Sequence, residues 1–324
     1  MSVSPDQLNV VICVPLPEAL RQQLRSGFPS VRFVFSDVHD LPEGFEDADV
    51  LIPWGISSEN LARMQRLKWV QTVSAGVDRI DFAQLKARGI PLTNSSGIHA
   101  NNISEHILAL MLAFARKLPL LVREQEQHRW SSEVGRISSF ELTGQTMLVV
   151  GLGKIGEQLA IRTKGMQMRV LGTRRRVEIE RASAADEVFA LSELTERISE
   201  ADHVAITLPL THDTEGMFTA ELIGRMKPGA YLYNIGRGSI IDQDALIAAL
   251  QTGRLGGAGL DVTTPEPLPG DSPLWDLPNV IITPHTSGSS PMLMERAVAL
   301  WIDNLNRFLA GDPLRNVVDL DAGY

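Results

Sequence analysis

The chain has 324 residues, of which 44% are hydrophobic and 21% charged, an ordinary composition for a folded protein that is long enough for two domains. Its formal net charge of −9 disfavours a general role in binding nucleic acid or membrane surfaces, because both are polyanionic. No basic N-terminal segment precedes a long apolar core, and no stretch approaches the roughly 20 apolar residues that span a bilayer. We therefore expect a cytoplasmic protein.

The cysteine and histidine content of the chain bears on disulfide formation and on metal binding. Cys13 lies in an apolar run, where we expect a small core residue, and it has no second cysteine for an intramolecular disulfide. This cysteine usage fits a reducing compartment. The seven histidines, His99 and His106 included, lack the i, i+4 spacing of a helical metal pair, so no metal site is predicted.

The first hundred residues alternate short apolar runs with helical patterns. Such alternation predicts a parallel sheet with helices on both faces. The expected strands cover residues 10–14, 31–35, 50–52, 69–73 and 91–94.

A longer helix is predicted to lead into a second domain. Apolar side chains repeat at helical spacing between residues 103 and 118. Asn102 stands where an N-cap is expected, and Glu105, three residues later, is placed as its capping-box partner.

The sequence GLGKIG, residues 151–156, is a glycine fingerprint that directly follows the apolar run Thr146–Val150. The run predicts a buried strand, residues 155–165 a helix and residues 168–172 a second strand, so the glycines fall on a strand-to-helix turn. That context is the one in which a glycine fingerprint predicts a dinucleotide site rather than an ordinary loop.

Each glycine of the fingerprint has a separate physical task. Gly151 permits the tight turn, Gly153 lets the backbone approach a pyrophosphate, and Gly156 allows the helix to pack closely on the strand. The N–H groups at the start of the helix then bind the anion.

Three arginines, residues 174–176, follow the second strand, where an NAD site usually has an acidic residue that accepts hydrogen bonds from the adenine ribose. A guanidinium cannot accept a hydrogen bond, but Arg174 and Arg175 can pair with a 2′-phosphate. The sequence therefore favours NADP(H), with NAD(H) possible. The alternative interpretation is a solvated basic loop.

The second half of the chain predicts another doubly wound parallel sheet. After the fingerprint unit, strands are expected at residues 203–208, 230–235, 258–262 and 280–283. A last helix is expected at residues 292–309, and the tail 316–319 is expected to return to the first domain.

Polar residues follow three of these strands and are candidates for catalysis. They lie in the segments 233–238, 260–267 and 283–285. Because ligands of open α/β sheets bind outside the carboxyl ends of the strands, we expect Arg237, Glu266 and His285 to converge. A turn, a surface loop and a structural histidine are the separate alternatives for these three residues.

The ordered set of motifs resembles the D-isomer-specific 2-hydroxyacid dehydrogenases over nearly the whole chain. The matching segments are the fingerprint at 151–156, Asn234 to Gly238, Leu260 to Val262 with the following Glu266 and Pro267, Thr283 to His285, and residues 73–78. The resemblance implies a flavodoxin-like substrate domain, residues 1–100 and 290–324, and a Rossmann NAD(P)-binding domain, residues 101–289. It also implies an active site in the interdomain cleft and a homodimer formed near residues 100–145.

The resemblance assigns the catalytic residues one by one. His285 matches the acid/base that protonates the carbonyl oxygen during reduction. Glu266 matches its carboxylate partner, which favours the imidazolium. Arg237 matches the residue that holds the substrate carboxylate and polarises the carbonyl.

The resemblance also implies the binding residues. Trp54, Ala75 and Gly76 would join Arg237 and His285 around the substrate, although a core role for Trp54 and a simple turn at 75–76 are alternatives. Core packing is the alternative for Ile235, and a helix cap is the alternative for Asp261. The implied cofactor contacts are Gly151, Gly153, Lys154, Ile155, Gly156, Thr173, Arg174, Arg175, Thr207, Leu208, Pro209, Ile235, Asp261 and Gly288.

One departure from many family members narrows the expected activity. Thr263, Thr264 and Pro265 precede Glu266, where many members have an aromatic and an acidic residue. This version resembles the glyoxylate and hydroxypyruvate reductase branch, so we expect an NADPH-preferring reductase of small 2-keto acids that makes D-2-hydroxy acids. The alternatives are an NAD-linked D-3-phosphoglycerate or D-lactate type dehydrogenase, and a dinucleotide-sensing protein similar to a corepressor of this fold.

Overall fold

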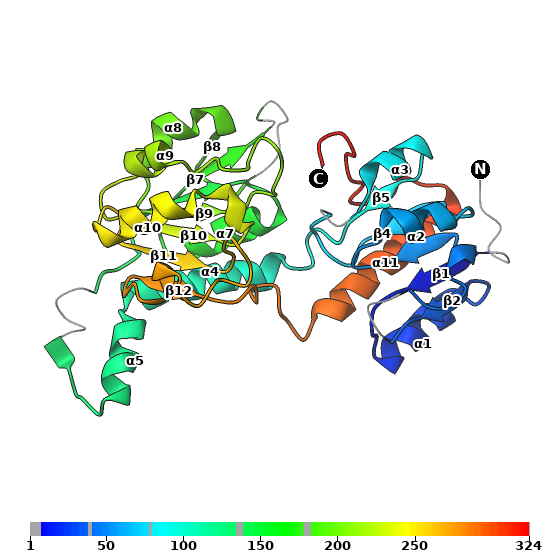
Figure 1. Cartoon of the computed structure of the whole chain (residues 1–324), viewed down its shortest axis with the longest axis horizontal. Coiled ribbons are helices and arrows are strands. Elements are labelled where there is room, and N and C mark those ends of the chain that lie inside the picture. Colours follow the sequence, from blue (N-terminus) through cyan, green and yellow to red (C-terminus); the bar gives the residue numbers. More distant parts are fainter. Residues whose placement is uncertain are drawn as a thin grey trace. The chain divides into compact units, whose positions relative to one another are not determined.

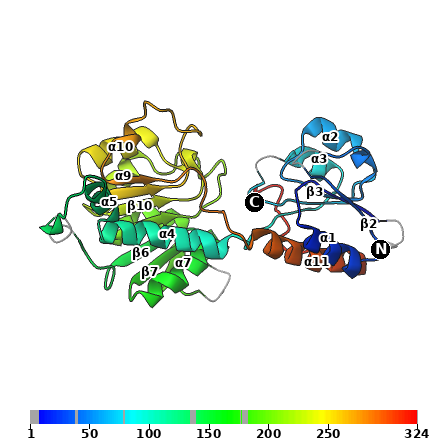
Figure 2. The same cartoon turned by 90° about the horizontal axis from the view of Figure 1, so that it is seen from below.

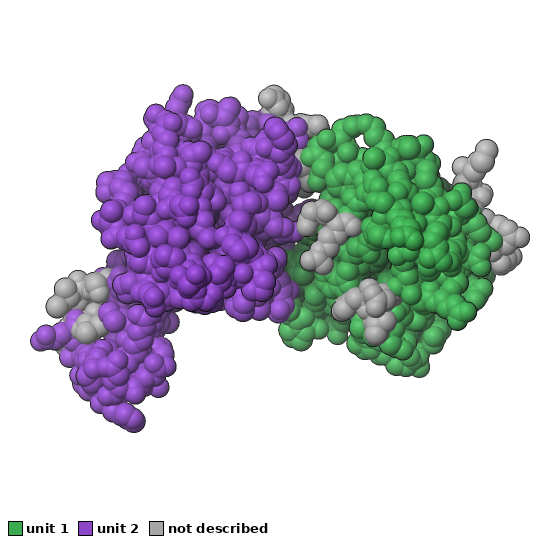
Figure 3. Space-filling view, viewed as in Figure 1, with its two compact units in different colours: residues 1–99, 290–324 green, residues 100–289 purple. Residues whose placement is uncertain are grey.

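The computed structural model describes residues 8–37, 41–77, 80–133, 139–175, 177 and 183–323. The chain divides into two compact units (Figure 3). Unit 1 comprises Met1–His99 and Ser290–Tyr324, and unit 2 comprises Ala100–Ser289. Two residues that the sequence analysis singled out, Asp78 and Arg176, lie outside the described residues.

Unit 1 contains a five-stranded parallel sheet with the order β2-β1-β3-β4-β5, which is the flavodoxin-like order. All five expected strands are present, most of them shorter than expected. Their bounds are Asn9–Ile12 for β1, Arg32–Phe35 for β2, Val50–Ile52 for β3, Trp69–Gln71 for β4 and Leu92–Thr93 for β5.

Helices cover both faces of the unit 1 sheet because alternate strand residues point to opposite sides. Figure 2 shows α1 and α11 side by side on one face and α2 and α3 on the other. Cys13 is buried in the core under α2 and α3, as expected. The bounds are Glu18–Gly27 for α1, Phe45–Asp47 for the 3-10 turn η2, Ser58–Arg63 for α2, Phe82–Ala87 for α3 and Leu293–Ala310 for α11.

The C-terminal tail returns to unit 1, as the sequence predicted. Val317 forms an antiparallel bridge with Thr93, and the Val318 amide donates a hydrogen bond of 2.8 Å to the Leu92 carbonyl. The tail therefore continues the sheet beyond β5.

Unit 2 contains a seven-stranded parallel sheet with the order β12-β11-β10-β9-β6-β7-β8. The strand order reverses between β6 and β9, which is the usual place for a ligand in such sheets. The bounds are Thr146–Val150 for β6, Arg169–Arg174 for β7, Glu187–Ala190 for β8, His203–Ile206 for β9, Tyr231–Asn234 for β10, Gly257–Leu260 for β11 and Val280–Ile282 for β12.

Two apolar cores lie on the two faces of the unit 2 sheet. One face packs against α4 and α7, and the other against α8, α9 and α10. The bounds are Ala100–Ala115 for α4, Leu118–Glu126 for α5, Lys154–Gly165 for α7, Leu194–Arg197 for α8, Ala220–Arg225 for α9 and Gln243–Gln251 for α10. The 3-10 turns are η3 Leu191–Glu193, η4 Ile198–Glu200, η5 Gly238–Ile240 and η6 Pro273–Trp275.

The expected start and end of the long helix were both wrong. Helix α4 begins at Ala100, so Asn102 lies inside its first turn and donates a hydrogen bond of 2.9 Å to the Ser287 carbonyl instead of capping. Helix α4 ends at Ala115, and a separate helix, α5, begins at Leu118 and extends away from the body of unit 2 (Figure 1). Pro119 explains the break, because it has no N–H to donate to the Ala115 carbonyl and its ring would clash there, whereas proline is tolerated in the first turn of a helix.

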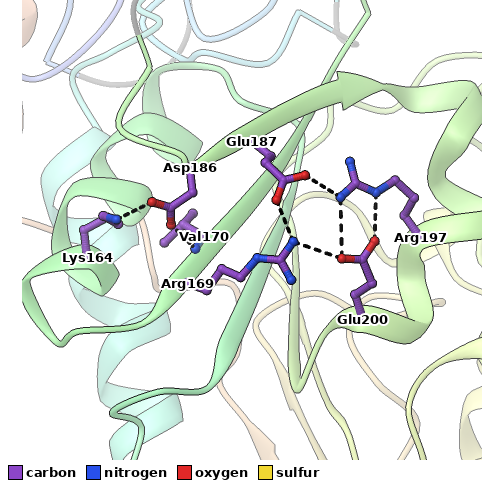
Figure 4. Close-up of polar contacts among 7 residues, drawn as sticks. All are labelled: Lys164, Arg169, Val170, Asp186, Glu187, Arg197 and Glu200. Atoms are coloured by element: carbon purple, nitrogen blue, oxygen red, sulfur yellow. Dashed lines mark hydrogen bonds and ion pairs between the residues drawn. The ribbon is translucent and has the colours of Figure 1, made fainter.

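Strand β8 is an edge strand that the sequence analysis did not predict. Four charged residues hold it against β7 and η4, as Figure 4 shows. Arg169 and Arg197 each bind both Glu187 and Glu200, with N–O distances of 2.6 to 3.5 Å. Hydrogen bonds from Arg169 and Arg197 keep the pKa of Glu187 below its ordinary value. Strand β8 has only four residues, Glu187 followed by three apolar ones, which is too short for a periodic pattern to be recognised.

Candidate active site

Six strands of the unit 2 sheet are aligned in one row at their carboxyl ends. Val150 of β6 pairs with Thr173 of β7 and Ile206 of β9, and the row continues through Asn234, Leu260 and Ile282. The residue after each of these positions therefore lies at the same edge of the sheet. These following residues are Arg174, Gly151, Thr207, Ile235, Asp261 and Thr283.

The glycine turn between β6 and α7 fits a dinucleotide pyrophosphate. A Cβ atom at Gly156 would lie 2.4 Å from the Gly151 carbonyl oxygen, so only glycine lets α7 pack this closely. Gly151 has φ +108°, which also favours glycine, whereas a Cβ at Gly153 would point into open space. Gly153 is the N-cap of α7, so this open space adjoins the free N–H groups of the helix.

Two threonines fix the glycine turn at the point where the strand order reverses. The Gly151 amide donates to Thr173 Oγ1 at 3.0 Å, and Thr207 Oγ1 donates to the Gly151 carbonyl at 2.6 Å. Thr173 is fully buried, so its side chain holds the turn from the interior of the unit. Leu208 packs over the turn, where a Cβ at Gly151 would lie 2.9 Å from its Cδ2 atom.

The remaining expected cofactor residues differ in exposure. Lys154, Arg175 and Pro209 are exposed, whereas Ile155, Leu208 and Gly288 are half-buried and Ile235 is 8% exposed within the core under α4 and α7.

The structure gives Arg174 a partner that the sequence analysis missed. Its Nη2 atom donates to the Glu157 carboxylate in the first turn of α7. The Arg174 side chain is only 11% exposed and that of Glu157 24%. Charge spacing along one helix or strand gives no signal for such a pair.

The structure brings His285 and Glu266 into contact. Nδ1 of His285 lies 2.9 Å from Oε2 of Glu266, and both side chains are partly exposed. The Thr263 amide donates to Oε1 of Glu266 at 3.2 Å, which fixes the carboxylate. Because the carboxylate holds Nδ1, Nε2 is the ring nitrogen that can exchange a proton with a ligand.

The segment that bears His285 is anchored by the buried Asp261. Its carboxylate accepts hydrogen bonds from the Thr283 hydroxyl at 2.6 Å, the Thr286 amide at 2.9 Å, and the Ser287 amide and hydroxyl. Burial opposes ionisation of Asp261, but these hydrogen bonds lower its pKa below the ordinary value. No helix begins at Asp261, so the helix-cap alternative was wrong.

His285 itself adopts an unusual backbone conformation within this segment. Its φ is +53°, in the left-handed region that residues other than glycine rarely adopt. Its amide donates to the Asp261 carbonyl at 2.9 Å, and His106 of α4 lies 3.0 Å from the Thr283 hydroxyl. Sequence reasoning missed His106, Ser287 and this anchoring role of Asp261.

Arg237 lies in a loop that approaches the Glu266 loop closely. The Asn234 side chain spans this loop, accepting from the Gly236 amide at 3.0 Å and donating to the Arg237 carbonyl at 2.9 Å. A Cβ at Gly238 would lie 2.0 Å from the Thr263 carbonyl oxygen. Glycine at 238 therefore allows the two loops to touch.

The expected substrate residues of unit 1 lie after two of its strands. Trp54 follows β3, is half-buried and packs against the core that α1 and α11 cover. Ala75 and Gly76 form an ordered turn after β4, because their carbonyls accept hydrogen bonds from Asn94 at 3.0 Å and Ser74 at 2.6 Å.

Two further observations concern the described part of the chain. None of its helices is long and apolar enough to cross a membrane. Within the same residues, no group of three or more His, Cys, Asp or Glu side chains is arranged to hold a metal ion.

Comparisons with known proteins show the family of this chain. Residues 108–287 match the family model described as D-isomer specific 2-hydroxyacid dehydrogenase, NAD binding domain. The chain is 33% identical over 320 residues to a glyoxylate/hydroxypyruvate reductase B of Yersinia enterocolitica, covering 96% of this chain and 97% of that protein.

Similar solved structures cover nearly the whole chain. A D-isomer specific 2-hydroxyacid dehydrogenase family protein from Aeromonas salmonicida is 34% identical with a TM-score of 0.83, covering 97% of this chain and 100% of that one. An NADPH-dependent glyoxylate/hydroxypyruvate reductase from Sinorhizobium meliloti, in complex with NADP and sulfate, is 27% identical with a TM-score of 0.81, covering 98% and 100%. The chain therefore belongs to the D-isomer specific 2-hydroxyacid dehydrogenase family and is an NAD(P)-dependent oxidoreductase.

Proposed function

We propose that this dehydrogenase reduces small 2-keto acids, glyoxylate and hydroxypyruvate among them, to D-2-hydroxy acids and prefers NADPH. The observation that carries the proposal is the His285–Glu266 pair on a segment anchored by Asp261, at the sheet edge that also bears Arg237 and the glycine turn. Reduction of a keto acid needs a proton donor, a cation for the carboxylate and a hydride donor. The bound dinucleotide supplies the hydride.

His285 is the proton donor in this proposal. As the imidazolium it donates from Nε2 to the carbonyl oxygen of the keto acid, and in the reverse direction the neutral ring accepts that proton. Glu266 favours the imidazolium through its negative charge and its hydrogen bond to Nδ1. The Asp261 carboxylate acts through the backbone by fixing residues 283–287.

Arg237 is the cation for the substrate carboxylate. Its planar guanidinium can form two parallel hydrogen bonds, which orient the acid as well as bind it. We assign the backbone amides of Ala75 and Gly76 to the same carboxylate and Trp54 to the side of the substrate pocket. Uncharged aldehydes of similar size are therefore expected to be poor substrates.

The preference for NADPH rests on Arg174 and Arg175 at the end of β7, where other sites have an acid for the ribose. The NADPH-dependent relative from Sinorhizobium meliloti supports the same preference. The other dinucleotide contacts that we propose are the residues of the glycine turn, Thr207 to Pro209, and the strand-end residues Ile235, Asp261 and Gly288.

We further propose a cytoplasmic homodimer that uses α5. Leu118, Val122 and Trp130, in and just after α5, are 47%, 50% and 98% exposed. Helix α5 projects from the body of unit 2 (Figure 1). Large apolar side chains exposed on such a helix are typical of a surface that another chain covers. Sedimentation at several protein concentrations tests this assembly.

The decisive experiment is a screen of 2-keto acids against both NADPH and NADH. We expect turnover of glyoxylate and hydroxypyruvate, with kcat/KM higher for NADPH. If aldehydes without a carboxylate reacted as well as the keto acids, the substrate assignment would be wrong. Equal kcat/KM for the two cofactors would refute the cofactor assignment only.

A further inference from the structure

Glu157 connects three parts of the predicted adenosine site through one carboxylate. Its Oε1 atom accepts hydrogen bonds from Arg174 Nη2 and from the Ser183 hydroxyl at 2.9 Å, and its Oε2 atom accepts from the Ala184 amide at 3.1 Å. Glu157 thereby joins the first turn of α7 to the end of β7 and to the segment before β8.

The pair changes what Arg174 offers to an anion. Arg174 ends β7, where a sheet of this order places the ribose of the dinucleotide. A guanidinium bound to a carboxylate forms a pair without net charge, and this pair is mostly shielded from water, since Arg174 is 11% exposed. A 2′-phosphate that approaches Arg174 therefore meets a guanidinium whose charge Glu157 already neutralises.

We propose that Glu157 is a specificity-determining residue that competes with the cofactor's 2′-phosphate for Arg174 and so limits the preference for NADPH over NADH. This inference rests on the proposed role of Arg174 toward the 2′-phosphate. Glu157 acts through Arg174 and has no part in the chemistry of reduction.

The structure favours competition over an ordering role for Glu157. Arg174 is held in place by its backbone, since it belongs to β7 and pairs with Ala190 of β8. Glu157 has two donors besides Arg174, from Ser183 and Ala184. A glutamine at 157 keeps an oxygen that can accept from these donors, so E157Q removes the negative charge and leaves both supporting segments in place.

The test uses fragments that differ only in the phosphate of interest and needs no keto acid. Binding of 2′,5′-ADP and of 5′-AMP to the full chain is measured by isothermal titration calorimetry, for the unmodified protein and for E157Q. We expect E157Q to bind 2′,5′-ADP on the order of tenfold more tightly, because a charged hydrogen bond becomes available. Binding of 5′-AMP should change less than twofold.

The matched control is E187Q in the neighbouring strand β8 (Figure 4). Glu187 also accepts from arginines, Arg169 and Arg197, so this variant removes the same charge and a similar pair. Glu187 pairs with Leu171, three residues before Arg174 in β7, so its backbone lies about 10 Å from that of Arg174 along the strand, more than one Debye length at physiological ionic strength. E187Q should leave the affinities for both fragments within about twofold.

A double-mutant cycle with R174M shows whether Glu157 acts through Arg174. The gain from E157Q should disappear in the R174M background. An unchanged or weaker affinity of E157Q for 2′,5′-ADP overturns the inference, as does an equal gain in both backgrounds, which would mean that Glu157 repels the phosphate directly. If R174M alone binds 2′,5′-ADP as the unmodified protein does, the proposed NADPH preference fails and the inference falls with it.

Discussion

The buried His203 should make the stability of the protein depend on pH. His203 begins β9 and is fully buried between Gln145 and Tyr233, with its Nε2 atom 2.6 Å from Gln145 Oε1 and its Nδ1 atom 3.0 Å from the Tyr233 hydroxyl. Burial lowers the pKa of His203 from 6.5 to about 4, and the nearby Asp202 opposes this shift weakly. Both hydrogen bonds suit a neutral ring that donates from Nε2 and accepts at Nδ1.

The sign and size of the effect follow from proton linkage. Between pH 6.5 and about 4 the unfolded chain binds a proton at His203 that the folded chain does not, so acid favours unfolding. The stability that the neutral ring contributes is present above pH 6.5 and is lost as the pH falls toward 4. The difference between the two pKa values corresponds to a contribution of about 3 kcal/mol to the free energy of unfolding. About 2 kcal/mol of this contribution is lost between pH 7 and pH 5.

Urea unfolding at pH 7 and pH 5 measures this contribution in H203Q and in the unmodified protein at one protein concentration. We expect the free energy of unfolding to fall by about 2 kcal/mol less in H203Q than in the unmodified protein over this interval. H212Q is the matched control, because the His212 side chain is fully exposed, and it should follow the unmodified protein. If H203Q also follows the unmodified protein, His203 is not held neutral by burial.

Three further variants test the catalytic loops. H285Q should lower kcat by about 10²–10⁴-fold while NADPH binding, measured by fluorescence, stays nearly unchanged, because a positioned proton donor is lost; a kcat close to that of the unmodified protein would remove His285 from this role. R237K should lower kcat/KM for glyoxylate substantially although the charge is kept, because lysine cannot form two parallel hydrogen bonds to the substrate carboxylate. A kcat/KM equal to that of the unmodified protein would contradict this role of Arg237. G238A should lower both the melting temperature and kcat/KM, because a Cβ there meets the Thr263 carbonyl at 2.0 Å and separates the two loops; an unperturbed variant would show that this contact is dispensable.

The parts of the fold that the sequence predicted well share one physical cause. Buried parallel strands are continuous apolar runs, so β6 and β10 are visible in a single sequence. The edge strand β8 has only four residues, and the first of them, Glu187, is exposed and held by ion pairs, so the strand is too short to show a periodic pattern. The capping box at Asn102 was predicted from local spacing alone, and the tertiary contact to Ser287 took its place.

The contact between His285 and Glu266 could be predicted from the sequence, whereas the environment of Arg174 could not. His285 and Glu266 follow strands of one parallel sheet. The carboxyl ends of parallel strands lie at one edge of the sheet, and this placement does not depend on individual side-chain contacts. Arg174 also lies at the end of a parallel strand, so its position at this edge could be predicted, but its ion pair with Glu157 could not. Because Glu157 comes from the preceding helix, the charge that a phosphate meets depends on a contact between elements. Cofactor preference is therefore harder to derive from this sequence than the chemistry, and it is the property that a single substitution at Glu157 is expected to change.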